Sequence, residues 1–120
     1  MIDERIENWL LDMNEAATNA VSFVDGMAHE DFLKDIRTQH AVAMCVLRIG
    51  ENASRLTDYR PVFLSEHPQV SWHSMTNMRN RIAHGYTDIN FNVVWDTVQE
   101  DLPNLIATIS TILRQAGKQV

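Results

Sequence analysis

The chain has 120 residues, 45% of them hydrophobic and 22% charged, and this composition excludes intrinsically disordered and fibrous proteins. At this length we expect one domain with a single core, over residues 1–120. The formal net charge of -6 argues against broad, non-specific binding to nucleic acids, which requires many lysine and arginine contacts to phosphates.

Two long amphipathic helices are predicted in the first half of the chain. Apolar residues spaced by three and four extend from residue 3 to 24, with acidic residues in the first turn and Gly26 just beyond the end. The same spacing predicts a second helix that begins near Asp31 or Asp35 and ends near Leu56. Gly50 lies inside this helix, where it suits a close contact with another helix.

The helical pattern breaks between residues 57 and 70. Pro61 and Pro68 bound a segment that is long enough for one or two helical turns. Ser71 is a plausible N-cap of a further helix of about twelve residues, and Gly85 is the natural end of that helix.

A last helical region is predicted from near Asn90 to about Ala116. Pro103 cannot continue a regular helix, so it kinks this region or marks a new start, with Asp101 as a possible cap. No segment has the alternation of a β-strand. We therefore expect an all-α protein, an antiparallel up-and-down helical bundle of four main helices plus a short one, with the last helix kinked near Pro103.

Several kinds of site and location are disfavoured by the same sequence. No apolar run approaches the roughly 18 to 20 residues of a membrane-spanning helix, and the N-terminus is acidic, so we expect a cytoplasmic protein with no membrane partner. Cys45, the single cysteine, lies in an apolar run and should be buried and unreactive. The five histidines lack the spacing of a zinc site, so we expect no metal and no cofactor.

The stretch MRNRIAHGY, residues 78–86, combines polar and charged side chains at the end of the predicted third helix. Trp72, Met75, Ile82 and position 86 fall on one stripe of that helix, and Arg79 lies on the same stripe. A guanidinium on a packing stripe needs a carboxylate, a phosphate or another subunit as its partner.

His84 follows Arg79 by five residues, about 140° round a continued helix, and Gly85 allows the chain to turn there. An imidazole can transfer protons at neutral pH, and a guanidinium can bind a phosphate and stabilise its developing charge. Such a pair is sufficient for metal-independent RNA cleavage in which the substrate's 2'-hydroxyl is the nucleophile. A histidine that merely complements the helix dipole is the alternative, and these residues alone leave both open.

A family resemblance bears on that choice. Arg79, His84 and Tyr86 form the pattern R-x4-H-x-Y, which resembles the motif of the HepT-like HEPN ribonuclease toxins, and Asn80 fits the polar residue that usually follows the arginine. IGENASRL (49–56) is similar to a Gly-Glu-Ala element of that family, although Asn52 intervenes here. The stretches around the motif and VVWDTVQEDLPNL are also similar, so the resemblance covers essentially the whole chain.

The resemblance implies a HEPN-like bundle that forms a homodimer, with two motifs in a cleft at the interface. It implies that Arg79 binds the phosphate of an RNA substrate, a tRNA or mRNA, that His84 is the acid or base, and that Asn80 orients the substrate or the histidine. Glu51 is an auxiliary candidate, for which helix capping or an ion pair is an equal alternative.

The family also implies a type VII-like toxin–antitoxin module. Its antitoxin is an MntA-like nucleotidyltransferase that transfers AMP to the motif tyrosine, here Tyr86. A non-catalytic HEPN module that binds a nucleotidyltransferase or a nucleotide is the alternative function. The net charge of -6 favours this alternative, whereas the intact arginine and histidine favour the enzyme. Residues 37–84, which contain six arginines and three acidic residues, form a locally basic zone that can take a phosphate-bearing ligand. Solvated helix faces are the alternative explanation, and taken alone the asymmetry favours it.

Overall fold

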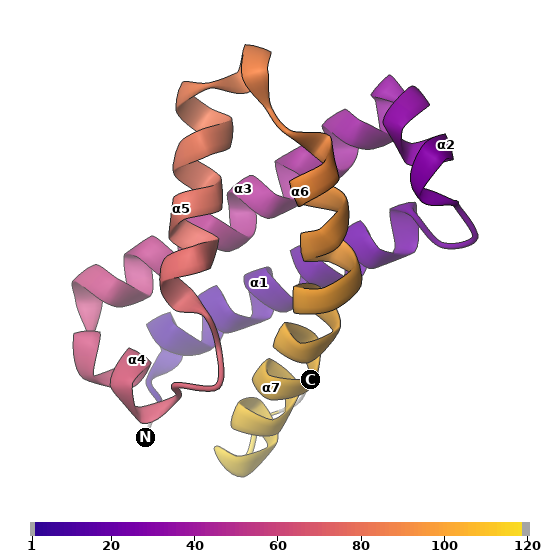
Figure 1. The fold of residues 1–120 in the computed structure, drawn as a ribbon. Coiled ribbons are helices and arrows are strands. Elements are labelled where there is room, and N and C mark those ends of the chain that lie inside the picture. Colours follow the sequence, from indigo (N-terminus) through magenta and orange to yellow (C-terminus); the bar gives the residue numbers. More distant parts are fainter. Residues whose placement is uncertain (1, 119–120) are drawn as a thin grey trace.

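The computed structural model describes residues 2–118, with only the backbone at Tyr86, and these residues form an all-α bundle (Figure 1). The predicted fold class is therefore confirmed. Its elements, in chain order, are α1 (Glu4–Phe23), α2 (His29–Lys34), α3 (Ile36–Tyr59), α4 (Pro61–Glu66), α5 (Trp72–His84), the 3-10 turn η1 (Tyr86–Asp88), α6 (Phe91–Asp96), the π-helical turn η2 (Thr97–Asp101) and α7 (Leu102–Gln115).

The first two long helices begin at aspartate caps. Asp3 accepts a hydrogen bond from the Ile6 backbone N–H at 3.0 Å, and Asp35 accepts one from the Thr38 backbone N–H at the same distance. These carboxylates satisfy N–H groups that have no partner inside the helix. The second predicted helix therefore begins after Asp35, the later of its two expected starts.

The segment before Asp35 corrects the expected number of short helices. Besides the four main helical regions the described residues form two short helices, α2 and α4, where one was expected. The reason is that the backbone at Asp35 leaves the helical conformation (φ -106°, ψ 89°) and separates α2 from α3. Phe32 on α2 is fully buried and packs against the rings of Phe91 and Trp95 on α6. The short helix thus covers the end of the bundle where α6 begins.

The expected interruption of the last helix is also present, in a different form. The π-helical turn η2 lies between α6 and α7, and Pro103 is the second residue of α7. Asp101 occupies the N-cap position of α7, as expected, although its side chain forms no capping hydrogen bond.

The helices pack around the central pair α1 and α3. α1 and α3 lie side by side in opposite directions, α5 packs on α3, and the α6–α7 segment returns along the other side to pack α7 on α1 (Figure 1). The core includes the fully buried Leu10, Ile49, Leu56, Leu102 and Ile109 from three of these helices. None of the described helices combines the length and apolar composition that a membrane crossing requires.

A polar contact joins α1 to α3 beside this core. Asp12 accepts hydrogen bonds at 2.6 Å from both Arg48 and Asn52, and the Asn52 amide group also donates to the Arg48 carbonyl oxygen at 2.9 Å. Asn52 is only 1% exposed, so its amide group needs such partners. This contact fixes the turn of α3 that carries Glu51.

Candidate active site

Arg79 lies where α5 crosses α3 at close range. The crossing is possible because Gly50 has no side chain: a Cβ there would overlap the Arg79 Cβ and would lie 2.6 Å from the Met75 carbonyl oxygen. The predicted close helix contact at Gly50 is therefore confirmed. The stem of Arg79 rests on the α3 backbone, which restricts where its guanidinium can point.

The guanidinium of Arg79 has a carboxylate partner in the same chain. Its Nε lies 3.8 Å from Oε2 of Glu51, and its Nη2 donates a long hydrogen bond of 3.4 Å to Oγ of Ser54. The side chain is 25% exposed, and its buried Nε has no hydrogen-bond acceptor within the described part of the chain. The guanidinium is thus oriented by α3 and retains capacity to donate to a further anion.

Glu51, the carboxylate beside Arg79, lies in the middle of α3. It also lies 3.8 Å from Nε of Arg55, one turn further along the helix. Because Glu51 is remote from both ends of α3, the helix-capping alternative is wrong and the ion-pair alternative is confirmed. Two arginines share one carboxylate, so the local charge around Glu51 remains positive.

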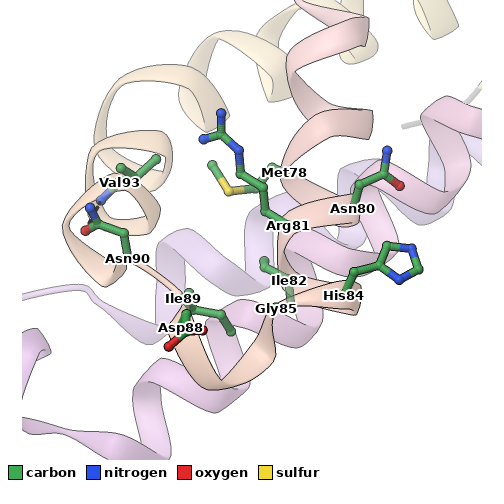
Figure 2. A pocket seen from close by; sticks show the side chains of 10 residues that line it. All are labelled: Met78, Asn80, Arg81, Ile82, His84, Gly85, Asp88, Ile89, Asn90 and Val93. Carbon is green, nitrogen blue, oxygen red and sulfur yellow. Dashed lines mark hydrogen bonds between the residues drawn. The ribbon is translucent and has the colours of Figure 1, made fainter.

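His84 and Asn80 occupy a different side of α5. His84 is the last residue of the helix, and its exposed ring forms no hydrogen bond or ion pair with any residue that the structure describes. Asn80 is exposed one turn earlier, and Figure 2 shows both side chains pointing to the same side of the helix. Arg79 is turned toward α3 instead. Within one chain the structure therefore brings Asn80 near His84 but does not bring Arg79 and His84 together.

The chain turns directly after His84. Gly85 ends α5 with φ -138°, and a Cβ at this position would lie 3.1 Å from the Arg81 carbonyl oxygen. Glycine is therefore used here for a close backbone approach rather than for a left-handed conformation. The turn η1 follows, and Tyr86 is its first residue. The predicted modification site Tyr86 has its side chain outside the described part of the structure.

A cavity beside the motif was not anticipated from the sequence. It has a volume of about 380 Å³ and lies between α5 and the segment from η1 to α6 (Figure 2). Arg81 contributes an exposed side chain to it, as helical geometry predicts for that residue. The opposite wall includes Asp88, Ile89 and Val93. The sequence predicted the start of a helix near Asn90, but only the fold places that start opposite the end of α5.

Other reactive side chains do not add to the site. Cys45 is buried, as predicted, and burial raises the pKa of its thiol, which keeps the nucleophilic thiolate scarce. Over residues 2–118, histidine, cysteine and acidic side chains form no cluster of three that could hold a metal ion.

Comparison with known proteins finds relatives along most of the chain. The family model "Ribonuclease HepT-like" matches residues 13–112. A Methanocaldococcus jannaschii protein named as a "Putative RNase" is 33% identical over 109 residues, which is 91% of this chain and 88% of that protein. The "Probable ribonuclease HepT" of Thermococcus cleftensis is 34% identical over 100 residues, which is 82% of this chain and 87% of that protein. No solved structure matches the chain.

Proposed function

The chain belongs to the HepT-like ribonuclease family, and we propose that it is a metal-independent endoribonuclease, the toxin component of a type VII-like toxin–antitoxin module. The single observation that carries this proposal is the state of the two motif side chains. Arg79 has an oriented guanidinium with unused donor capacity, and His84 has an exposed, unpartnered imidazole on the same helix.

The proposed reaction is an internal transesterification of RNA. The 2'-oxygen of the substrate attacks the adjacent phosphorus, its proton passes to a general base, and the bond from phosphorus to the 5'-oxygen breaks as that oxygen receives a proton. The products are a 2',3'-cyclic phosphate and a 5'-hydroxyl end. His84 transfers the protons, Arg79 stabilises the charge on the phosphoryl oxygens, and Asn80 orients the substrate or the histidine.

A homodimer is part of the proposal, because one chain presents its two key groups on different sides of α5. Arg79 is directed to α3 and His84 lies about 140° away on the outer side, so a single phosphate cannot readily contact both groups of one chain. Two chains that meet along this edge can place Arg79 of one beside His84 of the other. Glu51 then acts as a positioning residue for Arg79.

The regulation that we propose acts at Tyr86. A nucleotidyltransferase antitoxin of the MntA type would transfer AMP from ATP to the phenolic oxygen, which forms a phosphodiester and releases pyrophosphate and the phenolic proton. The position supports this role, since Tyr86 lies two residues after His84 and the next residues, Thr87 and Asp88, are exposed. An anionic adduct there would occupy the place of the substrate phosphate.

Cleavage of RNA by the purified chain in the presence of EDTA tests the activity. We expect products with cyclic phosphate ends, and we expect Arg79→Ala and His84→Ala to reduce the rate at least about a hundredfold. Arg114→Ala is the matched control, because it removes an exposed arginine on α7 and should leave the rate unchanged. Cleavage that requires a metal, or that survives in both motif variants, would contradict the proposal. Absence of cleavage in a chain that binds the nucleotidyltransferase would favour the non-catalytic module.

A further inference from the structure

The cavity between α5 and α6 has walls of two chemical kinds. Its interior is formed by Met78 and Ile82 from α5 and by Ile89 and Val93 from the opposite side (Figure 2). A volume of about 380 Å³ is within the usual range for small-molecule sites, and an apolar slot between two walls suits a flat ring. Ile82 is only 4% exposed, and the other three apolar side chains are partly buried.

Two opposite charges lie at the rim of this slot. Figure 2 shows the Arg81 guanidinium and the Asp88 carboxylate at opposite ends of the cavity. Both side chains are exposed, and neither has a hydrogen bond or ion pair with another residue described in the structure. A ligand that spans the slot therefore meets a free cation at one end and a free anion at the other.

Asn90 adds a donor to the same wall. Its Oδ1 accepts hydrogen bonds from the backbone N–H groups of Asn92 at 3.0 Å and Val93 at 3.4 Å, which start α6. Because the amide oxygen is used in this way, its NH2 group is the part of the side chain that remains available to a ligand. The rim thus offers donors from Arg81 and Asn90 and an acceptor from Asp88.

We propose that this cavity is a nucleotide subsite that takes one unpaired guanosine nucleotide of the RNA, with the base in the apolar slot and its phosphate at Arg81. Guanine has two adjacent donors, N1–H and the 2-amino group, that a single carboxylate can accept together, so Asp88 selects it over the other three bases. This inference rests on the proposed ribonuclease function, since it names the nucleotide bound next to the motif. Unpaired bases are the usual target of sequence-specific RNA recognition.

The position of the cavity fits a subsite adjacent to the reacting phosphate. Asn80 and His84 are among the residues that line the cavity, and Figure 2 shows their side chains pointing away from Asn90 and Val93. A base in the slot and a phosphate beside His84 therefore lie on two sides of one helix end, within reach of consecutive nucleotides of one strand. Substitution of Arg79, which is not among the lining residues, should leave the slot intact.

Binding of the four 5'-mononucleotides to the full chain tests the proposal without requiring cleavage. We expect 5'-GMP to bind more tightly than 5'-AMP, 5'-CMP and 5'-UMP in calorimetric titrations. Asp88→Asn should weaken 5'-GMP binding about tenfold and remove the preference, because an amide cannot accept two donors as a carboxylate does. Asp96→Asn, on the exposed side of α6, is the matched control and should change nothing.

Substitution of Arg81 should change the nucleotide affinities in a different way. Arg81→Ala should weaken all four mononucleotides about fivefold and leave the affinity for guanosine, which has no phosphate, unchanged. Methyl NMR signals of Ile82, Ile89 and Val93 should shift on binding, whereas the exposed Ile36 on α3 should not. Both substituted side chains are exposed and unpartnered, so these variants should fold normally.

The outcomes separate this inference from the ribonuclease proposal. Arg79→Ala, at a residue outside the cavity lining, should retain the preference for 5'-GMP although it loses cleavage. RNA cleavage without any preference for 5'-GMP, tighter binding of another mononucleotide, or shifts at Ile36 instead of the cavity methyl groups would overturn the subsite alone. Preference for 5'-GMP in a chain that cleaves no RNA would instead refute the ribonuclease function, and with it the assignment of the bound nucleotide to a substrate.

Discussion

At the scale of single residues, Arg79 combines a fixed charge with incomplete hydrogen bonding. Glu51 lies 3.8 Å from its Nε, too far for a hydrogen bond, and the contact to Ser54 is long at 3.4 Å. A fully satisfied guanidinium would have little affinity for a phosphate, and an unpaired one would adopt many rotamers. The observed arrangement orients the charge while its donors remain available to a substrate.

Substitution of Glu51 by glutamine should show whether Glu51 positions Arg79 or contributes to the binding of RNA. We expect kcat for RNA cleavage to fall about tenfold, because Arg79 loses the charge that orients it, while KM does not rise, because a carboxylate that repels phosphate has been removed. The thermal midpoint should change little, since the Glu51 side chain is 47% exposed. Steady-state kinetics of Glu51→Gln and of the exposed control Glu66→Gln measure kcat and KM for RNA cleavage. An increase in KM at constant kcat would show that Glu51 does not position Arg79.

At the scale of helices, the site depends on how closely α5 approaches α3. The contact is centred on Gly50. Glycine is the only residue type that leaves room there for Arg79 and the Met75 carbonyl oxygen. Helix propensity alone favours alanine over glycine at an interior helical position by about 1 kcal/mol. Packing and propensity therefore predict opposite effects of the same substitution.

Gly50→Ala should consequently destabilise the protein. We expect the free energy of unfolding to fall by about 1 to 3 kcal/mol, as for other overpacked contacts, and RNA cleavage to fall with it because Arg79 is displaced. Urea denaturation of the variant and the wild type gives the sign of the change in the free energy of unfolding directly. A more stable variant would mean that the two helices do not approach each other as closely as the structure indicates.

The polar contact between α1 and α3 makes stability depend on pH. Partial burial by itself would raise the pKa of Asp12, but the hydrogen bonds from Arg48 and Asn52 outweigh it and hold that pKa below its usual value of 3.8. A carboxyl whose pKa is lowered on folding stabilises the protein above its unfolded-state pKa, and this stabilisation disappears as the pH falls through the folded-state value.

Asp12→Asn should therefore lower the free energy of unfolding at neutral pH. The loss relative to the wild type should become smaller as the solution becomes more acidic. We expect a loss of about 1 kcal/mol at pH 7, a modest figure because the side chain is 42% exposed and water screens its charge. The difference from the wild type should begin to shrink as the pH falls below about 4. Urea denaturation across this range measures it, with Glu15→Gln, a weaker partner of Arg48, as the control. A difference that is independent of pH would contradict the assigned charge.

Prediction from the sequence succeeded where local patterns determine the structure. Apolar spacing was sufficient for the long helices, although it left the start of the second one open between Asp31 and Asp35. The packing stripe was sufficient to single out Arg79 as a residue in need of a partner. Local patterns cannot identify that partner, because Glu51 is distant in sequence and meets Arg79 only through the crossing at Gly50. The cavity between α5 and α6 depends on the relative placement of two helices and was missed for the same reason.

At the scale of the whole molecule, one chain supplies the parts of the proposed site without assembling them. Arg79 is turned to α3, and His84 lies at the exposed end of α5. With a net charge of -6, the chain has little general attraction for RNA, so the site must rely on a few well-placed groups. A second copy that brings its own Arg79 and His84 to the same edge is the simplest arrangement that meets this requirement.

Complementation between two inactive variants tests this central claim most directly. Arg79→Ala and His84→Ala chains, co-expressed with different tags and purified through both, form mixed pairs. If each site combines Arg79 of one chain with His84 of the other, one of the two sites in a mixed pair is intact. We predict that such pairs regain up to about half of the wild-type rate of RNA cleavage. Mixed pairs as inactive as either variant alone, or a wild-type chain that cleaves RNA but never co-purifies with a second copy, would contradict the account.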